Sequence, residues 1–555
     1  MEQASARAQS SDSLDLLRQA HAAQREFERV RRSHLPYELG VRQKDCDERI
    51  GRYCYWYEPM VESAPAEVAP VRVARESLLV ALQDAHQQLP GDGWITGQLV
   101  RYLAEEGFSD SAIATARSCT GLPWWCHALE GLARHRAHDY QGAEAAFSRA
   151  LREMPAAERC AWTDLGPLLG DGERLYRSRS CTARDSVNER IWWLARPLYS
   201  RPGNDLETEH YSRHTMALLL QYSATPDGGS WGDDRRRLGV RFGWPTHWSK
   251  REEPGALEPF WILGHEPGPS FWLFPAPALT EPWSDQTETR WDAYQERPPS
   301  RYAPPYATGF VSIERVQFAR FARRDTTLTV AVFDLASDSI FATHPADARL
   351  AVARDPATPI LVGRIFPATP RAVLSVRSAW RPAVLSLEAL GVDTPWVARR
   401  RAMAPPDPGG LQPTISDLLL FAPTDLLPRS LEATLPAALS GSVVRRGQRL
   451  GLFWEMYQES DSAATIEIAV TPKAGSKGEA PYPIGRPSCP FALESPVRLR
   501  WVEERRTRPI GPARSVALDL GSLSEGRYVV TIQLSWGSRV HGCSSREFRV
   551  ASSNR

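Results

Sequence analysis

Two histidines one helical turn apart are the sharpest candidate for chemistry in this sequence. His210 and His214 lie in the stretch ETEHYSRH together with Glu207 and Glu209. Two histidines at this spacing on one helix face can share a metal ion. However, Tyr211 stands where a zinc protease would carry its glutamate, and no third ligand is evident. We therefore interpret the stretch as a polar helix face with one histidine packed inward, and we predict no metal site.

A charged run further along the chain is the second candidate. Asp233 and Asp234 precede the three arginines of Arg235–Arg237. Together they could form an acid/base or anion site, although such a run is more often a solvated surface. Three tryptophans in the same region could line a groove for sugar rings or a peptide, but the core of a small domain is the favoured interpretation. They are Trp231, Trp244 and Trp248.

The common catalytic and cofactor motifs are missing from the sequence. It contains no GxSxG, Walker A, HExxH or GxGxxG pattern. The glycines Gly91, Gly93 and Gly97 have the wrong spacing for a dinucleotide loop and follow no predicted strand. We therefore predict no catalytic residue and no cofactor.

The elements that position these residues begin with helices. Apolar residues recur near helical spacing over residues 12–36, and helical patterning resumes after a Pro/Ala-rich linker and continues to about residue 155. Residues 124–155 resemble the tetratricopeptide (TPR) repeat, a helix pair with small residues at the helix contact and a proline at its end. The matching positions are Gly131, Ala143, Phe147, Ala150 and Pro155.

These positions have a steric meaning. Gly131 and Ala143 permit a close helix crossing, Phe147 fills the gap, and Pro155 prevents the second helix from continuing. A degenerate copy precedes the pair, over residues 94–119. Two copies are fewer than a stable stack usually needs, so we expect neighbouring helices to cap them. The alternative is an unrelated helical hairpin.

Residues 186–310 are expected to form a mixed α/β region. Its first part predicts two helices around a loop at residues 202–204. Its second part predicts a short strand at Leu238–Phe242, ended by Gly243. A Pro- and aromatic-rich segment follows, with short strands at Phe260–Leu263 and Phe271–Phe274.

This region resembles the GWxTD domain, a bacterial family often found with TPR helices. The name motif corresponds to Ser230–Asp234, where Ser230 replaces the glycine and Asp233 replaces the threonine. The basic stretch and the RFG-x-P sequence that follow are also similar. The resemblance carries over no catalytic role. The matching residues are Trp231, Asp233, Asp234, Arg241, Phe242, Gly243 and Pro245.

From about residue 309 the apolar period changes to two, which is typical of strands. Leu328, Val330 and Val332 form one such face, and further strands are predicted near 350–353, 360–362, 372–376 and 384–387. In the last part, strands are predicted over 450–456, 466–470, 497–501, 516–520 and 528–536. Short alternating strands separated by turns predict an immunoglobulin-like sandwich, in which one face of each strand packs on a facing sheet.

Composition excludes several classes of protein. The net charge is +1, so no global field favours nucleic acid or an anionic membrane. No apolar run approaches the ~18 residues that a membrane helix needs. Ala6-x-Ala8 resembles the cleavage end of a secretory signal whose apolar part is missing from the sequence, and the alternative is a frayed alanine-rich terminus.

The cysteines also indicate an exported protein, because disulfides form in oxidising compartments. They are even in number and form no CxxC pair, which argues against zinc ribbons and thioredoxin-like chemistry. They fall into local couples, as structural disulfides would, and we predict a Cys489–Cys543 bond in the last domain. Buried free thiols are the alternative. The candidates are Cys46, Cys54, Cys119, Cys126, Cys160, Cys181, Cys489 and Cys543.

The predicted fold is therefore multi-domain α + β. It comprises an N-terminal helix with a Cys/aromatic segment (1–60), TPR-like helical repeats (61–185), a mixed α/β GWxTD-like region (186–310), a β-sandwich (311–425) and an immunoglobulin-like sandwich (426–555). We predict a periplasmic or secreted envelope protein that binds a protein partner. The alternatives are an enzyme acting on envelope polymers, with its site in the GWxTD-like region, and a carbohydrate-binding surface protein. Converging carboxylates in a cleft of that region would favour the enzyme, and an apolar, charge-poor groove would favour binding.

Overall fold

The computed structural model describes residues 2–38, 46–56, 65–169, 173–252, 260–265, 306, 309–337, 340–404, 413–457, 463–473, 495–503, 512–537 and 539–552, with side chains from residue 12 onward except that of residue 310. The chain is a mixed α + β protein with two compact units. Among the described residues, unit 1 holds those up to Pro197 and those from Pro202 to His265. Unit 2 holds Leu198–Arg201 and those from Tyr306 onward.

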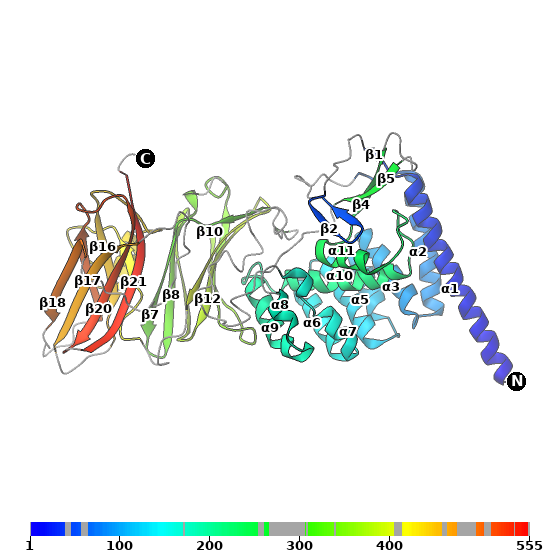
Figure 1. The fold of residues 1–555 in the computed structure, drawn as a ribbon, viewed down its shortest axis with the longest axis horizontal. Helices are drawn as coiled ribbons and strands as arrows, with labels where there is room; N and C mark the ends of the chain where they lie inside the picture. The colour runs from blue at the N-terminus through cyan, green and yellow to red at the C-terminus, as the bar shows by residue number, and fades with distance from the viewer. Residues whose placement is uncertain are drawn as a thin grey trace. The chain divides into compact units, whose positions relative to one another are not determined.

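Unit 1 is built mainly from helices (Figure 1). The carboxylate of Asp92 caps α3 by accepting from the backbone N–H groups of Trp94 and Ile95, and Asp139 caps α6 in the same way through Gly142. The first helices are α1 (Glu2–Ser33), α2 (Ala69–Gln88), α3 (Gly93–Glu105), α4 (Ser109–Arg117), α5 (Pro123–Arg136) and α6 (Tyr140–Glu153).

Helices α5 and α6 form the helix pair that the sequence predicts over residues 124–155. Ala143 and Ala150 are fully buried between neighbours, and a Cβ added at Gly131 would lie 2.7 Å from the Phe147 ring. This separation is far below van der Waals contact, so a larger residue at Gly131 would force the helices apart. The close approach expected between Gly131 and Phe147 is therefore present.

Further helices of unit 1 follow α6, and two of them lie on either side of a turn at residues 202–204. The two helices expected around residues 202–204 are present as α9 and α10, and Gly203 in the turn has a φ of +78°. Glycine adopts this left-handed conformation without steric cost. The helices are α7 (Ala156–Trp162), α8 (Glu173–Arg177), α9 (Cys181–Ala195), α10 (Asp205–Gln221) and α11 (Asp233–Phe242).

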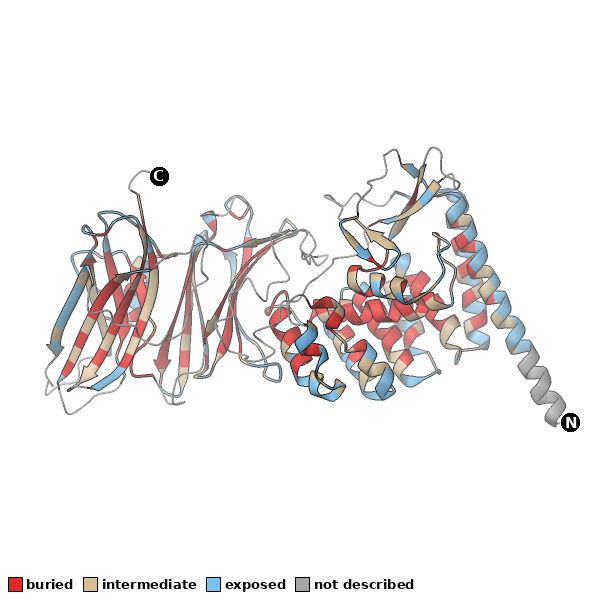
Figure 2. Ribbon diagram, in the orientation of Figure 1, coloured by how far each residue is buried: buried red, intermediate tan, exposed pale blue. Residues whose placement is uncertain are grey.

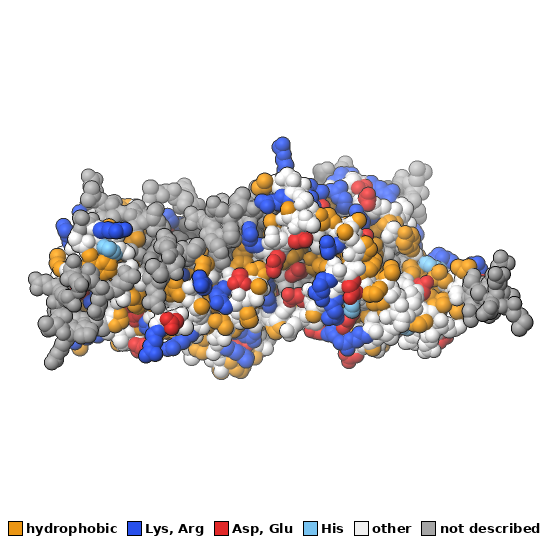
Figure 3. Space-filling view, turned by 90° about the horizontal axis from the view of Figure 1, so that it is seen from below, with side chains coloured by type: hydrophobic (Ala, Val, Ile, Leu, Met, Phe, Trp, Pro, Cys, Tyr) orange, Lys and Arg blue, Asp and Glu red, His pale blue; other side chains and the backbone are white. Residues whose placement is uncertain are grey.

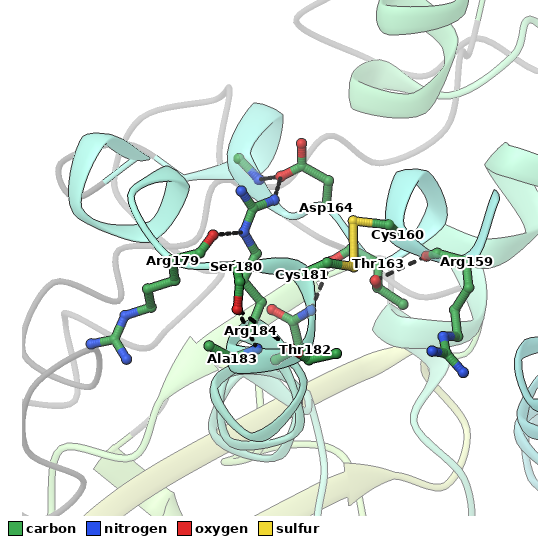
Figure 4. The surroundings of a disulfide bond; sticks show 12 residues. Arg159, Cys160, Thr163, Asp164, Arg179, Ser180, Cys181, Thr182, Ala183 and Arg184 are labelled. Atoms are coloured by element: carbon green, nitrogen blue, oxygen red, sulfur yellow. Dashed lines mark hydrogen bonds and ion pairs between the residues drawn. A yellow bond between two sulfur atoms is a disulfide. The ribbon is translucent and has the colours of Figure 1, made fainter. Parts of the chain in front are cut away.

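A disulfide joins two of these helices (Figure 4). Cys160 on α7 is bonded to Cys181, the first residue of α9. Beside the bond, Arg184 on α9 forms an ion pair with Asp164, at 3.3 Å between Nη1 and Oδ1. The Ser180 hydroxyl caps α9 by accepting from a backbone N–H of its first turn. The start of α9 is thus fixed by a covalent bond, an ion pair and a cap.

The strand predicted at Leu238–Phe242 is wrong, because these residues belong to helix α11. Alternating apolar residues suggested a period of two, but the buried positions Arg235, Gly239 and Phe242 have helical spacing. Two aspartates in the first turn suit the start of a helix. Gly243, with a φ of +91°, ends it in the left-handed region that glycine favours.

Unit 1 also contains two small sheets. Strands β1 (Tyr37–Glu38), β4 (His247–Glu252) and β5 (Phe260–His265) form one sheet in the order β1-β4-β5. Strands β2 (Glu48–Ile50) and β3 (Tyr53–Tyr55) form a hairpin. Strand β5 confirms the prediction for residues 260–263, whereas Phe271–Phe274 lies outside the described residues.

The first module of unit 2 consists of two facing sheets. A five-stranded sheet (β10-β9-β12-β13-β6) and a three-stranded sheet (β11-β8-β7) share one apolar core, and Figure 2 shows the buried stripes on their strands. The strands are β6 (Gly309–Ser312), β7 (Val316–Arg323), β8 (Thr326–Asp334), β9 (Ala346–Ala353), β10 (Leu361–Ala368), β11 (Arg371–Ala379), β12 (Ala383–Gly391) and β13 (Trp396–Ala404).

The second module repeats this plan. A five-stranded sheet (β15-β21-β20-β17-β18) faces a three-stranded sheet (β14-β16-β19) across a second core. The strands are β14 (Leu419–Phe421), β15 (Val443–Arg445), β16 (Arg449–Glu455), β17 (Ala464–Pro472), β18 (Val497–Glu503), β19 (Ala513–Asp519), β20 (Gly526–Trp536) and β21 (Arg539–Ala551). Each strand predicted from period-two alternation between residues 311 and 555 is present.

The two modules have similar strand topologies that differ in their first two strands. Strand β6 lies in the five-stranded sheet and β7 in the three-stranded one, whereas β14 lies in the three-stranded sheet and β15 in the five-stranded one. In each, the last strand pairs in parallel with a short early strand, β13 with β6 and β21 with β15. The neighbouring strands of both sheets pair in an antiparallel manner. Two consecutive parts of the chain with different sequences therefore form sandwiches of similar plan, each with a five-stranded sheet facing a three-stranded one.

The modules contact each other through their three-stranded sheets. Phe321 on β7, Phe421 on β14 and Phe453 on β16 belong to one buried apolar cluster. The Gln317 side chain on β7 binds both backbone polar groups of Leu420. Its amide oxygen accepts from Leu420 N at 2.9 Å, and its amide nitrogen donates to Leu420 O at 3.0 Å. The contact between the modules thus combines an apolar cluster with hydrogen bonds.

A four-residue segment from the helical half of the sequence belongs to unit 2. Leu198 and Tyr199 are buried, and the backbone N–H groups of Tyr199 and Ser200 donate to the Glu388 carboxylate at 2.8 and 3.0 Å. Glu388 lies on β12, is fully buried and also accepts from the Ser386 hydroxyl at 2.7 Å. The Leu198–Arg201 segment therefore satisfies a buried carboxylate that β12 alone would leave with fewer partners.

Disulfides link three of the predicted cysteine couples. The bonds are Cys46–Cys54, Cys119–Cys126 and Cys160–Cys181. Cys489 lies outside the described residues, so the Cys489–Cys543 pairing stays a prediction, although Cys543 itself is disulfide-bonded. None of the helices that the structure describes is long and apolar enough to cross a membrane.

Candidate functional site

A pocket of about 660 Å³ in unit 1 is the candidate functional site. Its walls come from the end of α1, the first turns of α2, the ends of α3 and α5, and the segment after α11, which contributes Trp244 and Trp248. The helices that resemble TPR repeats and the segment that resembles the GWxTD motif both contribute to it. We call it the arginine pocket, after the residues Arg31, Arg72, Arg75, Arg101 and Arg136.

Three of these arginines are neutralised by glutamates. Glu105 of α3 accepts from Arg31 at 2.9 Å, from Arg101 at 2.9 Å and from Arg75 at 3.3 Å. Arg75 also contacts Glu106 at 2.6 Å. The three guanidinium groups are almost completely buried, so this shared set of ion pairs compensates for the water that they lose on folding.

The Glu105 carboxylate of the pocket is an ionised base with no proton to donate. Burial would raise the pKa of Glu105, but Arg101, Arg31 and Arg75 outweigh it and hold the pKa well below its usual range. A general acid would need a raised pKa and contact with a substrate. Carboxylates thus converge in this cleft, but they come from residues 61–185 and are ion-paired, which does not match the acid–base site expected of an enzyme.

The motif residues mainly hold local structure together. Arg241 at the end of α11 forms an ion pair with Glu48 on β2, and the Phe242 ring stacks on Tyr55 of β3 at 3.9 Å between centroids. A Cβ added at Gly51, in the turn of this hairpin, would lie 1.9 Å from the Asp234 carboxylate. Helix α11 and the β2–β3 hairpin are therefore packed against each other by the motif.

The charged side chains of the run around Asp233 have different partners and do not converge on one site. The Asp233 side chain is 87% exposed and is 3.4 Å from Arg236, while Arg235 is buried and binds Asp227 at 2.7 Å. Glu209, the nearby carboxylate of α10, is engaged by His135 and Arg213. No acid/base pair forms among these described residues. Charges of both signs are also interspersed over the face of the molecule in Figure 3.

Two of the three tryptophans pack in the core of unit 1, Trp244 as a buried member and Trp231 as a half-buried neighbour, whereas Trp248 is half-buried outside this cluster. Trp244 is buried, stacks on Trp231 at 5.9 Å between ring centroids and donates from Nε1 to Arg213 O. Trp248 lies under the Arg31 guanidinium, at 5.4 Å from its ring centroid. Trp244 and Trp248 also line the arginine pocket, so the Trp244 ring both supports the core and forms part of the pocket wall.

The two histidines of α10 are buried side by side. The rings of His210 and His214 are 4.7 Å apart, and His210 Nε2 donates to Trp162 O at 2.9 Å. No three His, Cys, Asp or Glu side chains converge as metal ligands among the residues that the structure describes. Burial lowers the pKa of His210 to about 4 and that of His214 well below its usual value. Both rings are therefore neutral at pH 7.

Acid is expected to destabilise unit 1 through these rings. Because the folded pKa of His210 lies below its ordinary value, the unfolded chain binds more protons, and stability is lost as the pH falls from about 6.5 towards 4. His210 alone would contribute roughly 3 kcal/mol over this range. Urea unfolding at several pH values measures the slope, which we expect to flatten in the double variant His210→Gln, His214→Phe. His34→Gln, at an exposed histidine, is the matched control; an unchanged slope in the double variant would contradict the assignment.

Two hydroxyl–histidine–carboxylate contacts, which the sequence does not predict, occur in unit 1. In the first, His135 Nε2 is 2.7 Å from Glu209 and its Nδ1 is 2.9 Å from the Thr208 hydroxyl. In the second, His265 Nε2 is 2.7 Å from the Ser249 hydroxyl and 2.9 Å from Glu38.

Neither contact has the geometry of a nucleophilic site. Thr208 is fully buried, so no substrate reaches its hydroxyl. Ser249 is 1% exposed, and its hydroxyl approaches the same ring nitrogen of His265 as the carboxylate does. A nucleophile and an orienting carboxylate must use opposite ring nitrogens for the imidazole to act as a base. Both contacts are therefore structural hydrogen bonds between packed elements.

Sequence reasoning missed the arginine pocket itself. Its arginines are spread over about a hundred residues and four helices, and no motif joins them. A signal was present in the helix pattern, because Arg31, Arg75 and Arg101 lie on faces that the apolar positions of α1, α2 and α3 assign to the core. A buried arginine on such a face requires a partner.

Comparisons with known proteins identify no family. No family model matches the chain, and no curated protein matches it. Among solved structures, the chain is similar to the crystal structure of red sea bream transglutaminase, with 10% identity and a TM-score of 0.15. The match covers 59% of this chain and 46% of that chain, so this chain spans less than half of that structure. A similarity of this size carries no argument about activity.

Proposed function

We propose that this protein is an exported binding protein of the bacterial cell envelope, which recognises a protein partner through the arginine pocket. One observation carries the proposal: apolar and charged side chains from the TPR-like helices and from the GWxTD-like region of unit 1 converge on one cavity, where arginines hold the pKa of Glu105 well below its usual range. A site of this kind suits recognition, since none of the hydroxyl–histidine pairs described has catalytic geometry.

The architecture supports the same role. The helix pairs α3–α4 and α5–α6 lie where the sequence resembles TPR repeats, and such repeats present surfaces for other proteins. Each module of unit 2 packs two mainly antiparallel sheets face to face, which supports an immunoglobulin-like sandwich. The GWxTD resemblance agrees with helices preceding that region. Three disulfides favour an oxidising compartment.

Site-specific crosslinking in the native cells tests the proposal. A photo-crosslinking residue at Val68, on the rim of the pocket and 46% exposed, is expected to capture a protein partner. The same residue at Leu122, which is 63% exposed and does not line the pocket, is the matched control and should capture none. In parallel, the purified protein is assayed on peptidoglycan, glycan and ester substrates. Turnover that Asp234→Asn abolishes, with no adduct specific to Val68, would contradict the proposal in favour of an enzyme.

A further inference from the structure

Two of the five arginines in the pocket are not neutralised. Arg72 on α2 and Arg136 at the end of α5 are exposed, and neither forms an ion pair with any residue that the structure describes. Within the part of the chain that the structure describes, Arg72 donates from Nη1 to the backbone oxygen of Glu67 at 3.5 Å. The rim of the pocket therefore presents two guanidinium groups whose donors face solvent.

The glutamates of the pocket have no capacity left for these two arginines. Glu105 already binds three guanidinium groups, and Glu106 and Glu67 bind Arg75. The charge on Arg72 is therefore left for a ligand. Arg136 acts on Glu209 through space but forms no ion pair with a described residue, so its guanidinium donors are also left for a ligand. Planar guanidinium forks match the geometry of a carboxylate, with two parallel N–H···O bonds to each.

The interior of the pocket is apolar beside this charged rim. Val71, Leu132, Met216 and Trp244 line it and are each at least nine-tenths buried. Its volume of about 660 Å³ falls in the range of roughly 300–1,000 Å³ that is typical of ligand sites. A ligand that fills it must combine a negative group with an apolar group a short distance away.

We propose that the arginine pocket binds an acidic segment of a polypeptide in an extended conformation. Arg72 and Arg136 hold its carboxylates at the rim, and a neighbouring apolar side chain enters against Met216 and Trp244. An extended chain places side chains i and i+2 on the same side, so an acidic residue two positions away from an apolar one presents both groups to one surface. This inference rests on the proposed function and names the chemistry of the partner.

Fluorescence anisotropy with a defined peptide tests the inference on the full-length protein. The probe is a short fluorescein-labelled peptide of serines, in which a central phenylalanine has a glutamate two positions before and two positions after it. We expect it to bind at low ionic strength and to weaken with added salt. The same peptide with glutamine in place of glutamate, and one with alanine in place of phenylalanine, should each bind roughly tenfold more weakly.

Protein variants assign the binding to the rim. The double variant Arg72→Gln, Arg136→Gln is expected to weaken binding of the glutamate peptide by roughly tenfold or more, without changing the circular dichroism spectrum. Arg152→Gln is the matched control, because Arg152 is exposed on α6 away from the pocket. Equal binding by the double variant and the parent, or no binding of the peptide at all, would overturn the inference.

Two further probes separate the ligand class from the proposed function. If inorganic phosphate or vesicles of anionic phospholipid bind through Arg72 and Arg136 while the peptide does not, the acidic-peptide assignment is overturned. If crosslinking from Val68 still captures a protein in the Arg72→Gln, Arg136→Gln variant at the parent's level, the proposed function stands and the inference fails. Loss of both the adduct and peptide binding in that variant supports both.

Discussion

Replacement of Arg213 by methionine is expected to cost unit 1 about 3–5 kcal/mol of unfolding free energy, because it breaks a buried ion pair. Arg213 is 2% exposed, binds Glu209 at 2.6 Å and donates from Nη1 to Arg241 O at 2.6 Å and to Val240 O at 3.2 Å. These two carbonyls belong to the last turn of α11, where no further helical N–H reaches them. The substitution would leave both the carboxylate and the helix end without this donor.

Chemical denaturation followed by tryptophan fluorescence measures the effect, with Trp231 and Trp244 near the site as reporters. Arg213→Lys keeps the charge but cannot reach the carboxylate and the carbonyls together, so we expect an intermediate loss. Arg236→Met is the matched control: Arg236 lies on α11, the helix whose last carbonyls Arg213 binds, is 42% exposed and is expected to cost under about 1 kcal/mol. Stability of Arg213→Met within about 1 kcal/mol of the parent would disprove the assigned role.

Replacement of Asp417 by alanine is expected to cost unit 2 a similar amount, about 3–5 kcal/mol, and to uncouple its two modules. Arg320 on β7 and Asp417, just before β14, are 7% and 14% exposed and are 2.9 Å apart between Nε and Oδ2. Asp417 also accepts from the backbone N–H of Arg320 at 2.9 Å. Without the carboxylate, a buried guanidinium remains beside the apolar contact between the modules.

Calorimetry distinguishes this effect from a local one. The parent modules are expected to unfold in one transition, and Asp417→Ala is expected to split it into two. The double variant Arg320→Leu, Asp417→Leu removes both charges and should recover part of the stability. Lys473→Ala, at an ion pair whose lysine is 36% exposed, should change little. A single transition of unchanged midpoint in Asp417→Ala would rule out this coupling.

The strands of unit 2 were predictable because local pattern and tertiary environment agree there. Each strand has one face in a core, so the alternation over Leu450–Trp454 or Tyr528–Leu534 carries the structure directly. Helix α11 was not predictable from the apolar pattern, since its apolar residues also alternate. What decided its conformation was the pair of aspartates in the first turn and Gly243 at the end.

The site was less predictable than the fold for a different reason. The steric role of Gly131 could be inferred from residues sixteen apart, because the motif is local. The arginine pocket depends on contacts such as Arg31 with Glu105, which join helices 74 residues apart. Spacing within a sequence says nothing about such pairs. The same holds for His135 and Glu209, whose contact follows from the packing of α5 on α10.

The Leu198–Arg201 segment also imposes an order of events during folding. Tyr199 is 189 residues before Glu388, so β12 obtains these hydrogen bonds only after almost four hundred residues have been synthesised. Until then no sheet covers the apolar side chains of Leu198 and Tyr199. We expect chaperones to bind the exposed segment during this period. Contacts of such long range slow the completion of a fold. A fragment that begins at residue 306 would lack the segment altogether, and the buried carboxylate of Glu388 would lose two of its donors.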